Sequence, residues 1–157
     1  MHRVVGIIAC GESSKDADEE ARGYLDAALN NNANWIDWYQ GVKESQRWDL
    51  KESPDKPILL SKKIAADKCK ALIIAGQRDF NEWYLTASQL LEKNGLTDLE
   101  DTCSHFRIAC SGTSVWLFDA TEYSGGYLRD FELFEKVKNH AVKNNNKLWL
   151  CLYDTHN

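Results

Sequence analysis

Short, nearly continuous apolar runs recur along the chain and are separated by longer amphipathic stretches. The runs are Val4–Ala9, Ala71–Gly76, Val115–Phe118 and Leu148–Tyr153, with a less regular one at Trp35–Tyr39. Apolar runs of this length without alternation are typical of strands that are buried on both faces. We therefore predict five strands, of which the four continuous ones are central or nearly so and Trp35–Tyr39 lies nearer an edge.

Between these runs, apolar residues recur at intervals of three and four, as on one face of an amphipathic helix. Two Asn clusters, at residues 30–32 and 144–146, favour helix C-termini because Asn tolerates the left-handed conformation. The predicted helices run from the Asp16-x-x-Glu19 capping box to about Leu29, from Pro57 to about Cys69, from the Asp79-x-x-Glu82 capping box to Gly95, from Thr97-x-x-Glu100 to Gly112, and from about Tyr127 to Lys143.

Strands that alternate with helices indicate βαβ units and a mostly parallel sheet. The chain has 157 residues, of which 43% are apolar and 27% are charged, and these values fit one folded domain. We therefore predict a single Rossmann-like α/β domain over residues 1–157, a three-layer sandwich with about five mainly parallel strands. The same composition excludes a disordered chain and a fibrous one.

No apolar run approaches the roughly 18 residues of a membrane span, and acids follow the short apolar stretch at the N-terminus. We therefore predict a cytoplasmic protein that does not associate with membranes. Five cysteines at irregular spacing, without a Cys-x-x-Cys pair, then favour reduced thiols over disulfides. Because metal-ligand spacing is also missing, we expect neither a metal site nor a cofactor.

The net charge of −5, with basic and acidic residues interleaved, argues against a general nucleic-acid binder. A compact anionic ligand remains compatible with this charge because it needs only a local site. Six tryptophans are many for this length, and they suit either the core or stacking on a planar ligand. The sequence leaves the oligomeric state open, and a homo-oligomer is compatible with it.

Residues with usable chemistry follow the predicted strands, where open α/β sheets bind ligands. Small residues before a helix let backbone N–H groups approach an anion, although glycine after a strand is also ordinary turn chemistry. The predicted ligand-binding residues are Cys10, Gly11, Ser13 and Ser14 after the first strand, Gly76 and Arg78 after the third, and Ser124, Gly125 and Gly126 after the fourth.

Asp130 lies about 60° from the centre of the predicted buried face of its helix, in the first turn. This position points its carboxylate along the sheet edge towards the strand ends, with a simple helix-dipole role as the alternative. Arg78 likewise suits either an anionic ligand or an ion pair with Asp79 or Glu82.

The segment Gly41–Lys56 is polar and aperiodic, and we interpret it as a long loop. Loops of this length in compact domains are often lids over a ligand. Trp48 within it would cover a base, or else would pin the loop to the body of the domain.

The segment CSGTSVWLFDATEYSGGYLRDFELFEKVKNHAVKNNNKLWLCLYD contains a strand ending in an acid, a glycine turn, an acid in a helix's first turn and a final strand. In this order it resembles the end of nucleoside 2-deoxyribosyltransferase-like proteins. The resemblance implies that Asp119 is the strand-end acid and that Ser124–Gly126 form the turn. It places Asp130 where the family usually carries its nucleophilic Glu, and the shorter Asp is a departure from the family.

The segment ALIIAGQRDFNEWYLTASQLLEKNG resembles the opening of another nucleotide-binding group, the SLOG superfamily. In that group a turn of the form aGsRdf follows the first strand, and Gly76, Arg78, Asp79 and Phe80 match it. The Gly-rich phosphate loop that follows the second strand in SLOG proteins is absent here. Both resemblances imply a Rossmann-like sheet whose ligand is a nucleoside or a nucleotide.

Three functions are compatible with these features, and the sequence leaves open whether the protein is an enzyme. The first is cleavage or transfer of an N-glycosidic bond, with Asp130 as nucleophile or charge stabiliser and Asp119 as orienter or proton donor. The second is a non-catalytic nucleotide-binding sensor, or a scavenger of a signalling nucleotide. The third is an inhibitor or immunity-type protein, suggested by the acidity and by aromatic residues that look exposed.

Overall fold

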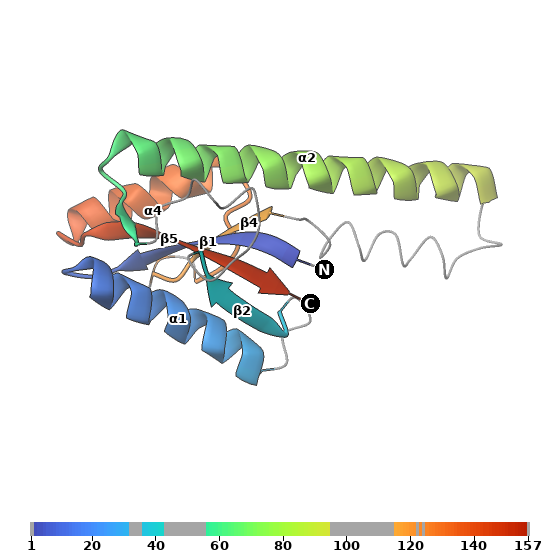
Figure 1. Cartoon of the computed structure of the whole chain (residues 1–157). Coiled ribbons are helices and arrows are strands. Elements are labelled where there is room, and N and C mark those ends of the chain that lie inside the picture. The colour runs from blue at the N-terminus through green and yellow to red at the C-terminus, as the bar shows by residue number, and fades with distance from the viewer. Residues whose placement is uncertain are drawn as a thin grey trace.

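The structure is a computed structural model that describes residues 2–31, 36–42, 56–94, 115–121, 123 and 125–156. In these ranges the chain forms three helices and one five-stranded sheet (Figure 1). The elements are β1 (His2–Cys10), α1 (Ser14–Asn30), β2 (Trp38–Gly41), β3 (Ile58–Leu59), α2 (Lys63–Asn94), β4 (Val115–Asp119), α4 (Phe131–Lys143) and β5 (Leu148–His156).

The sheet has the strand order β2-β5-β1-β4, and β3 also pairs with β5. Only the pairing of β1 with β4 is parallel, whereas β5 is antiparallel to β1, β2 and β3. The prediction of a mainly parallel, Rossmann-like sheet is therefore wrong. Four strands do share one direction, and the antiparallel pairings all arise because the reversed strand β5 lies between β1 and the β2/β3 edge.

The reversal of β5 has its origin in the connection between β4 and α4. After Asp119 the chain turns and runs back beside β4, where Tyr127 forms an antiparallel bridge with Phe118 and the Leu128 N–H donates to the Leu117 carbonyl at 2.9 Å. The helix α4 therefore begins near the start of β4 and runs in the direction of that strand. Because α4 ends at the carboxyl end of β4, β5 must enter the sheet there and run the opposite way.

The sheet is covered on both faces, which confirms the three-layer α/β arrangement. Alternate residues of β1 separate the two cores: Val4 and Ile8 pack with α2 and α4, whereas Val5 and Ile7 pack with α1. Figure 1 shows α1 on one side of the sheet and both α2 and α4 on the other.

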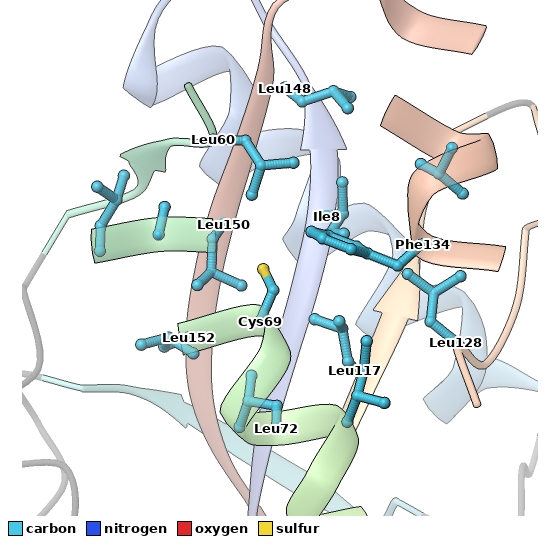
Figure 2. Packing of buried hydrophobic residues seen from close by; sticks show 14 of the residues in the cluster. Ile8, Leu60, Cys69, Leu72, Leu117, Leu128, Phe134, Leu148, Leu150 and Leu152 are labelled. Atoms are coloured by element: carbon cyan, nitrogen blue, oxygen red, sulfur yellow. The ribbon is translucent and has the colours of Figure 1, made fainter. Parts of the chain in front are cut away.

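The core on the α2 and α4 side is the larger of the two. Figure 2 shows Cys69 and Leu72 of α2 facing the sheet, with the Phe134 ring of α4 pointing towards Ile8 of β1. All four are less than 8% exposed. At Gly6, an added Cβ would lie 2.6 Å from Leu72 Cδ1, so that the glycine lets α2 approach β1 closely.

The region of α2 differs most from the sequence prediction. The apolar run Ala71–Gly76, predicted as a central strand, lies inside this 32-residue helix, and so does the Asp79-x-x-Glu82 box that was predicted to cap a new helix. A short continuous apolar run fits a buried strand and a buried helix turn equally well, because its periodicity does not distinguish them. At about 1.5 Å per residue α2 is about 48 Å long, and its C-terminal part extends beyond the sheet (Figure 1).

Smaller differences concern element boundaries. Pro57 does not open a helix: Ile58 and Leu59 form β3, and α2 begins only at Lys63. The less regular strand does lie at a sheet edge as predicted, but it is Trp38–Gly41. In the described sheet β4 also lies at an edge, although a central or nearly central place was predicted for it. The helix predicted over residues 97–112 lies outside the described residues.

None of the helices in the described part of the chain has the length and apolarity that crossing a membrane requires. In the described ranges no disulfide involves the cysteines at 10, 69 and 151, and those at 103 and 110 lie outside these ranges.

Candidate functional site

A crevice of about 410 Å³ lies at the carboxyl ends of the two parallel strands, β1 and β4. Parallel strands bring their carboxyl ends to the same edge of a sheet, which is where α/β proteins commonly bind ligands. We call this cavity the carboxyl-end crevice. It is lined by Cys10 of β1, Glu20 of α1, Ala120 and Thr121 after β4, and His140, Ala141 and Asn146 at the end of α4.

Asp119 does not line the crevice but holds the turn that does. Its side chain is completely buried, and its Oδ1 accepts the Thr121 N–H at 2.9 Å. Thr121 Oγ1 in turn accepts the Tyr123 N–H at 3.3 Å. The pKa of the Tyr24 phenol is raised, first by burial and then by the charge of Asp119. Asp119 thus positions Thr121 in the wall of the crevice.

The last turn of α4 supplies the opposite wall. The His140 ring lies 5.0 Å from the Tyr123 ring, and its Nε2 lies 2.8 Å from the Asn144 side-chain nitrogen. The helix ends with Asn145 in the left-handed conformation (φ 57°), and the Asn146 N–H donates to the Ala141 carbonyl at 2.9 Å. This use of the Asn cluster as a helix C-terminus was predicted, and it carries the Asn146 side chain into the crevice wall.

The charge of these walls limits the ligands that the crevice can accept. Glu20 brings a carboxylate, and no Lys or Arg of the described residues lines the crevice. The C-terminal end of a helix also carries a partial negative charge, and α4 presents that end here. A phosphate group would therefore be repelled, whereas an uncharged ligand would find hydrogen-bonding partners in Thr121, His140 and Asn146.

The loop after β1 contributes less to this crevice than its sequence suggested. Ser13 is the N-cap of α1: its Oγ accepts the Asp16 N–H, and the Asp16 carboxylate accepts the Ser13 N–H. The capping box is therefore Ser13 with Asp16, and not Asp16 with Glu19 as predicted. The Gly11 carbonyl accepts the Trp149 Nε1–H at 2.8 Å, and Ser14 lines a separate cavity beside β5.

Asp130 lies away from the crevice. It is the N-cap of α4, where its Oδ1 accepts the Leu133 N–H at 2.8 Å. Because the chain runs back along β4 before α4 starts, Asp130 lies towards the beginning of β4, whereas Asp119 ends that strand. The expectation that Asp130 lies in the first turn and points towards the strand ends is therefore wrong. The described contacts do not bring Asp130 and Asp119 together.

The remaining candidate residues are also dispersed. Gly76 and Arg78 lie within α2 and do not follow a strand, and Arg78 forms an exposed ion pair with Asp79 at 3.3 Å, the alternative considered from the sequence. The Gly126 carbonyl accepts the Asp119 N–H, and Gly125 (φ 56°) is exposed. Trp48, Ser124 and most of the predicted lid Gly41–Lys56 lie outside the described residues.

Of the described residues that line the crevice, Cys10 alone was among the predicted site residues, and the polar ones that sequence reasoning missed are Glu20, Thr121, His140 and Asn146. Glu20 and His140 read as surface positions of two helices, and no spacing rule connects them. The signal that would have found His140 and Asn146 is the Asn cluster, because it marks the end of α4, and that end faces the strand ends.

The comparisons with known proteins add no assignment: no family model, no curated protein and no solved structure matches this chain. In the described ranges, no group of three or more His, Cys, Asp or Glu side chains could hold a metal ion.

Proposed function

We propose that the protein binds an uncharged nucleoside, or a similar sugar-linked base, in the carboxyl-end crevice. The observation that carries this proposal is the crevice itself, a polar cavity of about 410 Å³ at the ends of two parallel strands. Its size lies in the usual range of small-molecule sites. The resemblance of residues 110–154 to the end of nucleoside 2-deoxyribosyltransferase-like proteins supports this ligand class, and the acidic walls favour the nucleoside over its phosphorylated forms.

The groups around the crevice fit the two parts of such a ligand. Thr121, Asn146 and Glu20 offer the hydroxyl, amide and carboxylate groups that recognise sugar hydroxyls and base edges. The Tyr123 ring is 40% exposed and lies beside His140, so that a planar base has an aromatic face next to the crevice. In this proposal Cys10 and Ala120 form the inner wall.

Cleavage of the N-glycosidic bond is the second candidate, and Glu20 is the observation that favours it. A carboxylate near the anomeric carbon stabilises an oxocarbenium-like state or attacks it. Asp130 was the candidate from the sequence, but its carboxylate is bound to the Leu133 N–H at the other end of α4. Among the described residues that line the crevice, Glu20 is the one with a carboxylate side chain. In this second candidate it takes the role that was given to Asp130.

Thermal unfolding in the presence of a nucleoside panel and the matching 5′-monophosphates tests the proposal. A nucleoside at 100 times its dissociation constant should add about 2.7 kcal/mol of stability, and the monophosphate should add clearly less. In Glu20→Gln the monophosphate should gain affinity relative to the nucleoside, because one like charge has been removed. Glu92→Gln, an exposed carboxylate on α2, is the matched control and should change neither value.

The same samples separate binding from cleavage. Chromatography of the incubated nucleosides should show free base if the protein is a glycosidase, and Glu20→Gln should then abolish its release. Binding without base release leaves the protein a nucleoside binder. Absence of stabilisation by every nucleoside, or tighter binding of the monophosphates to the wild-type protein, would overturn the proposal.

A further inference from the structure

The edge of the sheet beside β5 is interrupted in the middle. β2 and β3 pair with the same side of β5, since β1 occupies the other side along its whole length. Gly41 of β2 lies opposite Tyr153, and Ile58 of β3 lies opposite Leu150. The two β5 residues between these positions, Cys151 and Leu152, face neither strand in this register. β2 and β3 thus lie on one line along β5, and in the described residues Cys151 and Leu152 separate the positions that they pair with.

A cavity of about 250 Å³ lies at this interruption, on the side of the sheet that α1 covers, and we call it the edge cavity. The first turns of α1 form one wall, and the ends of the interrupted strand form another. The side chains that matter for its chemistry are Ser14, Lys15, Asp18 and Arg22 of α1, Lys56 before β3, and Tyr153 of β5. It is separate from the carboxyl-end crevice, with which it shares no lining residue.

Among the described residues that line the edge cavity, Asp18 is the acid, and its carboxylate already has two partners. Asp18 accepts the Tyr153 hydroxyl at 2.7 Å through Oδ1 and the Arg22 Nε–H at 2.8 Å through Oδ2. Burial, followed by smaller contributions that include this hydrogen bond, raises the pKa of Tyr153, so that the phenol keeps its proton. Asp18 therefore neutralises part of Arg22 and has little left to repel an incoming anion.

The described residues that line the edge cavity carry more positive than negative charge. Lys15, Arg22 and Lys56 line the cavity, so that the described lining residues, three cations and one carboxylate, leave two positive charges in a chain whose net charge is −5. Arg22 lies over the Tyr153 ring, with its guanidinium carbon 5.5 Å from the ring centre, and bonds Asp18 only through Nε. Lys15 pairs with Glu19 at 3.4 Å, but both side chains are largely exposed, so this pair is weak.

The backbone adds to the same charge preference. Ser14 and Lys15 are the first residues of α1, and the N-terminal end of a helix carries a partial positive charge. The Asp16 carboxylate, the acid of this first turn, bonds back to Ser13 and does not line the cavity.

We propose that the edge cavity binds a small molecule through a doubly charged phosphate group. Lys15, Lys56 and Arg22 are the cationic contacts, and the hydroxyl of Ser14 is the neutral donor. This site is independent of the nucleoside site and opposite to it in charge. A phosphate ester is thus directed to the edge cavity and kept out of the carboxyl-end crevice.

Calorimetric titration with pyrophosphate, and separately with inorganic phosphate, tests this site at low and at moderate salt. We expect saturable binding that weakens as salt is raised, because screening reduces the attraction of exposed cations. Lys56→Gln and Lys15→Gln should each weaken pyrophosphate binding about fivefold or more. Both side chains are exposed, so these variants should keep the wild-type melting temperature.

The matched control is Lys70→Gln, which removes an exposed lysine from α2 on the other side of the sheet. It should leave pyrophosphate affinity unchanged. Equal losses in Lys70→Gln and Lys56→Gln would show general charge attraction and overturn the proposal, as would the absence of pyrophosphate binding. Glu20→Gln should leave pyrophosphate binding unchanged, and Lys56→Gln should leave nucleoside binding unchanged, so that the two sites can fail independently.

Discussion

The carboxyl-end crevice and the edge cavity flank the same helix, α1, and have walls of opposite charge. The crevice contains Glu20 and the C-terminal end of α4, whereas the edge cavity contains three cations and the N-terminal end of α1. α1 begins directly after β1, so that its positive end lies near that strand's end. The chain runs back along β4 before α4 begins, so that α4 has its C-terminal end, and not its N-terminal end, at the crevice. The chemistry of a strand end thus depends on which end of a helix faces it.

Small residues after a strand are therefore a poor guide to anion binding in this chain. The segment Cys10–Ser14 has the composition of a phosphate loop. At the start of α1, however, the Ser13 side chain accepts the Asp16 N–H and the Asp16 side chain accepts the Ser13 N–H. Its outer residues face different cavities: Cys10 lines the crevice, and Ser14 lines the edge cavity. One loop that looked like one site contributes to two.

The largest expected effect is a difference in thiol reactivity between the two cavities. Cys10 is half-buried in the crevice, whereas Cys151 in the wall of the edge cavity and Cys69 in the core are buried. Burial raises the pKa of the Cys69 and Cys151 thiols to about 12. At pH 8 their thiolate fraction is then about a thousandfold below that of a thiol at the usual 9.0. Alkylation with iodoacetamide, located by peptide mass spectrometry, should modify Cys10 before either of them.

The pH dependence of the alkylation rate tests whether the pKa of Cys151 is raised. Because the pKa values are raised, labelling of Cys151 in the folded protein should climb about tenfold per pH unit and still be rising at pH 11. Denatured protein, in which all thiols have ordinary pKa values, is the control. Labelling of Cys151 as fast as Cys10 in the folded protein would show that the interrupted edge opens β5 to solvent.

The next effect concerns Gly11, in the loop between the two cavities. An added Cβ there would lie 2.6 Å from the Ala17 backbone nitrogen and 3.0 Å from the Ser13 carbonyl oxygen, atoms that cannot rotate away. Gly11→Ala should therefore destabilise the protein by about 1–3 kcal/mol in urea unfolding, and it should weaken ligand binding to both cavities.

Gly23→Ala is the matched substitution for Gly11→Ala. Gly23 is exposed in the middle of α1, and a Cβ there would meet nothing within 4 Å. Alanine should stabilise the helix by about 0.5–1 kcal/mol and leave both cavities intact. If both substitutions had the same sign, the loop after β1 would not be as tightly packed as the structure has it.

The fold could be predicted where local pattern and tertiary environment agree. Val4–Ala9 and Leu148–Tyr153 are buried on both faces, and both appear as central strands. Ala71–Gly76 has a similar composition but forms part of a helix. Leu72 and Ile73 are buried on the side of this helix that faces the sheet, whereas Ile74 is exposed. Nothing in the run itself distinguishes these two environments.

The candidate site could be predicted less well, because it depends on strand direction. The rule that ligands bind at strand ends placed Cys10 at the crevice, and the chain position of Thr121 after β4 follows from the same rule. Asp130 was misplaced because the antiparallel run at residues 126–129 reverses α4. That run is held by backbone hydrogen bonds from Leu128 and Asp119, which side-chain patterns do not encode.

A smaller change in stability, at Asp130, tests the direction of α4. Its carboxylate caps α4 by accepting the Leu133 N–H, so Asp130→Ala should destabilise the protein by about 1 kcal/mol. Asp130→Asn keeps an equally good cap and should be nearly neutral. Neither variant should alter nucleoside binding, measured by calorimetry. A large loss of nucleoside affinity or of base release in Asp130→Asn would return this residue to the site and contradict the described path of the chain.

The last comparison takes one hydroxyl from each cavity, and Thr121→Val within it has the smallest expected effect on stability. The Tyr153 hydroxyl donates to the Asp18 carboxylate at 2.7 Å, and a short bond to a charged group contributes more than a neutral one. Tyr153→Phe should therefore destabilise the protein by about 1–2 kcal/mol in urea unfolding. It should also weaken pyrophosphate binding, since the Asp18 carboxylate loses a hydrogen-bond donor and repels an anion more strongly. At Thr121 the hydroxyl Oγ1 accepts a backbone N–H at 3.3 Å, so that Thr121→Val should destabilise the protein by less than about 0.5 kcal/mol.

Because Thr121 lines the crevice, the same variant should still weaken nucleoside binding. An unchanged nucleoside affinity would mean that the ligand does not reach the turn after β4.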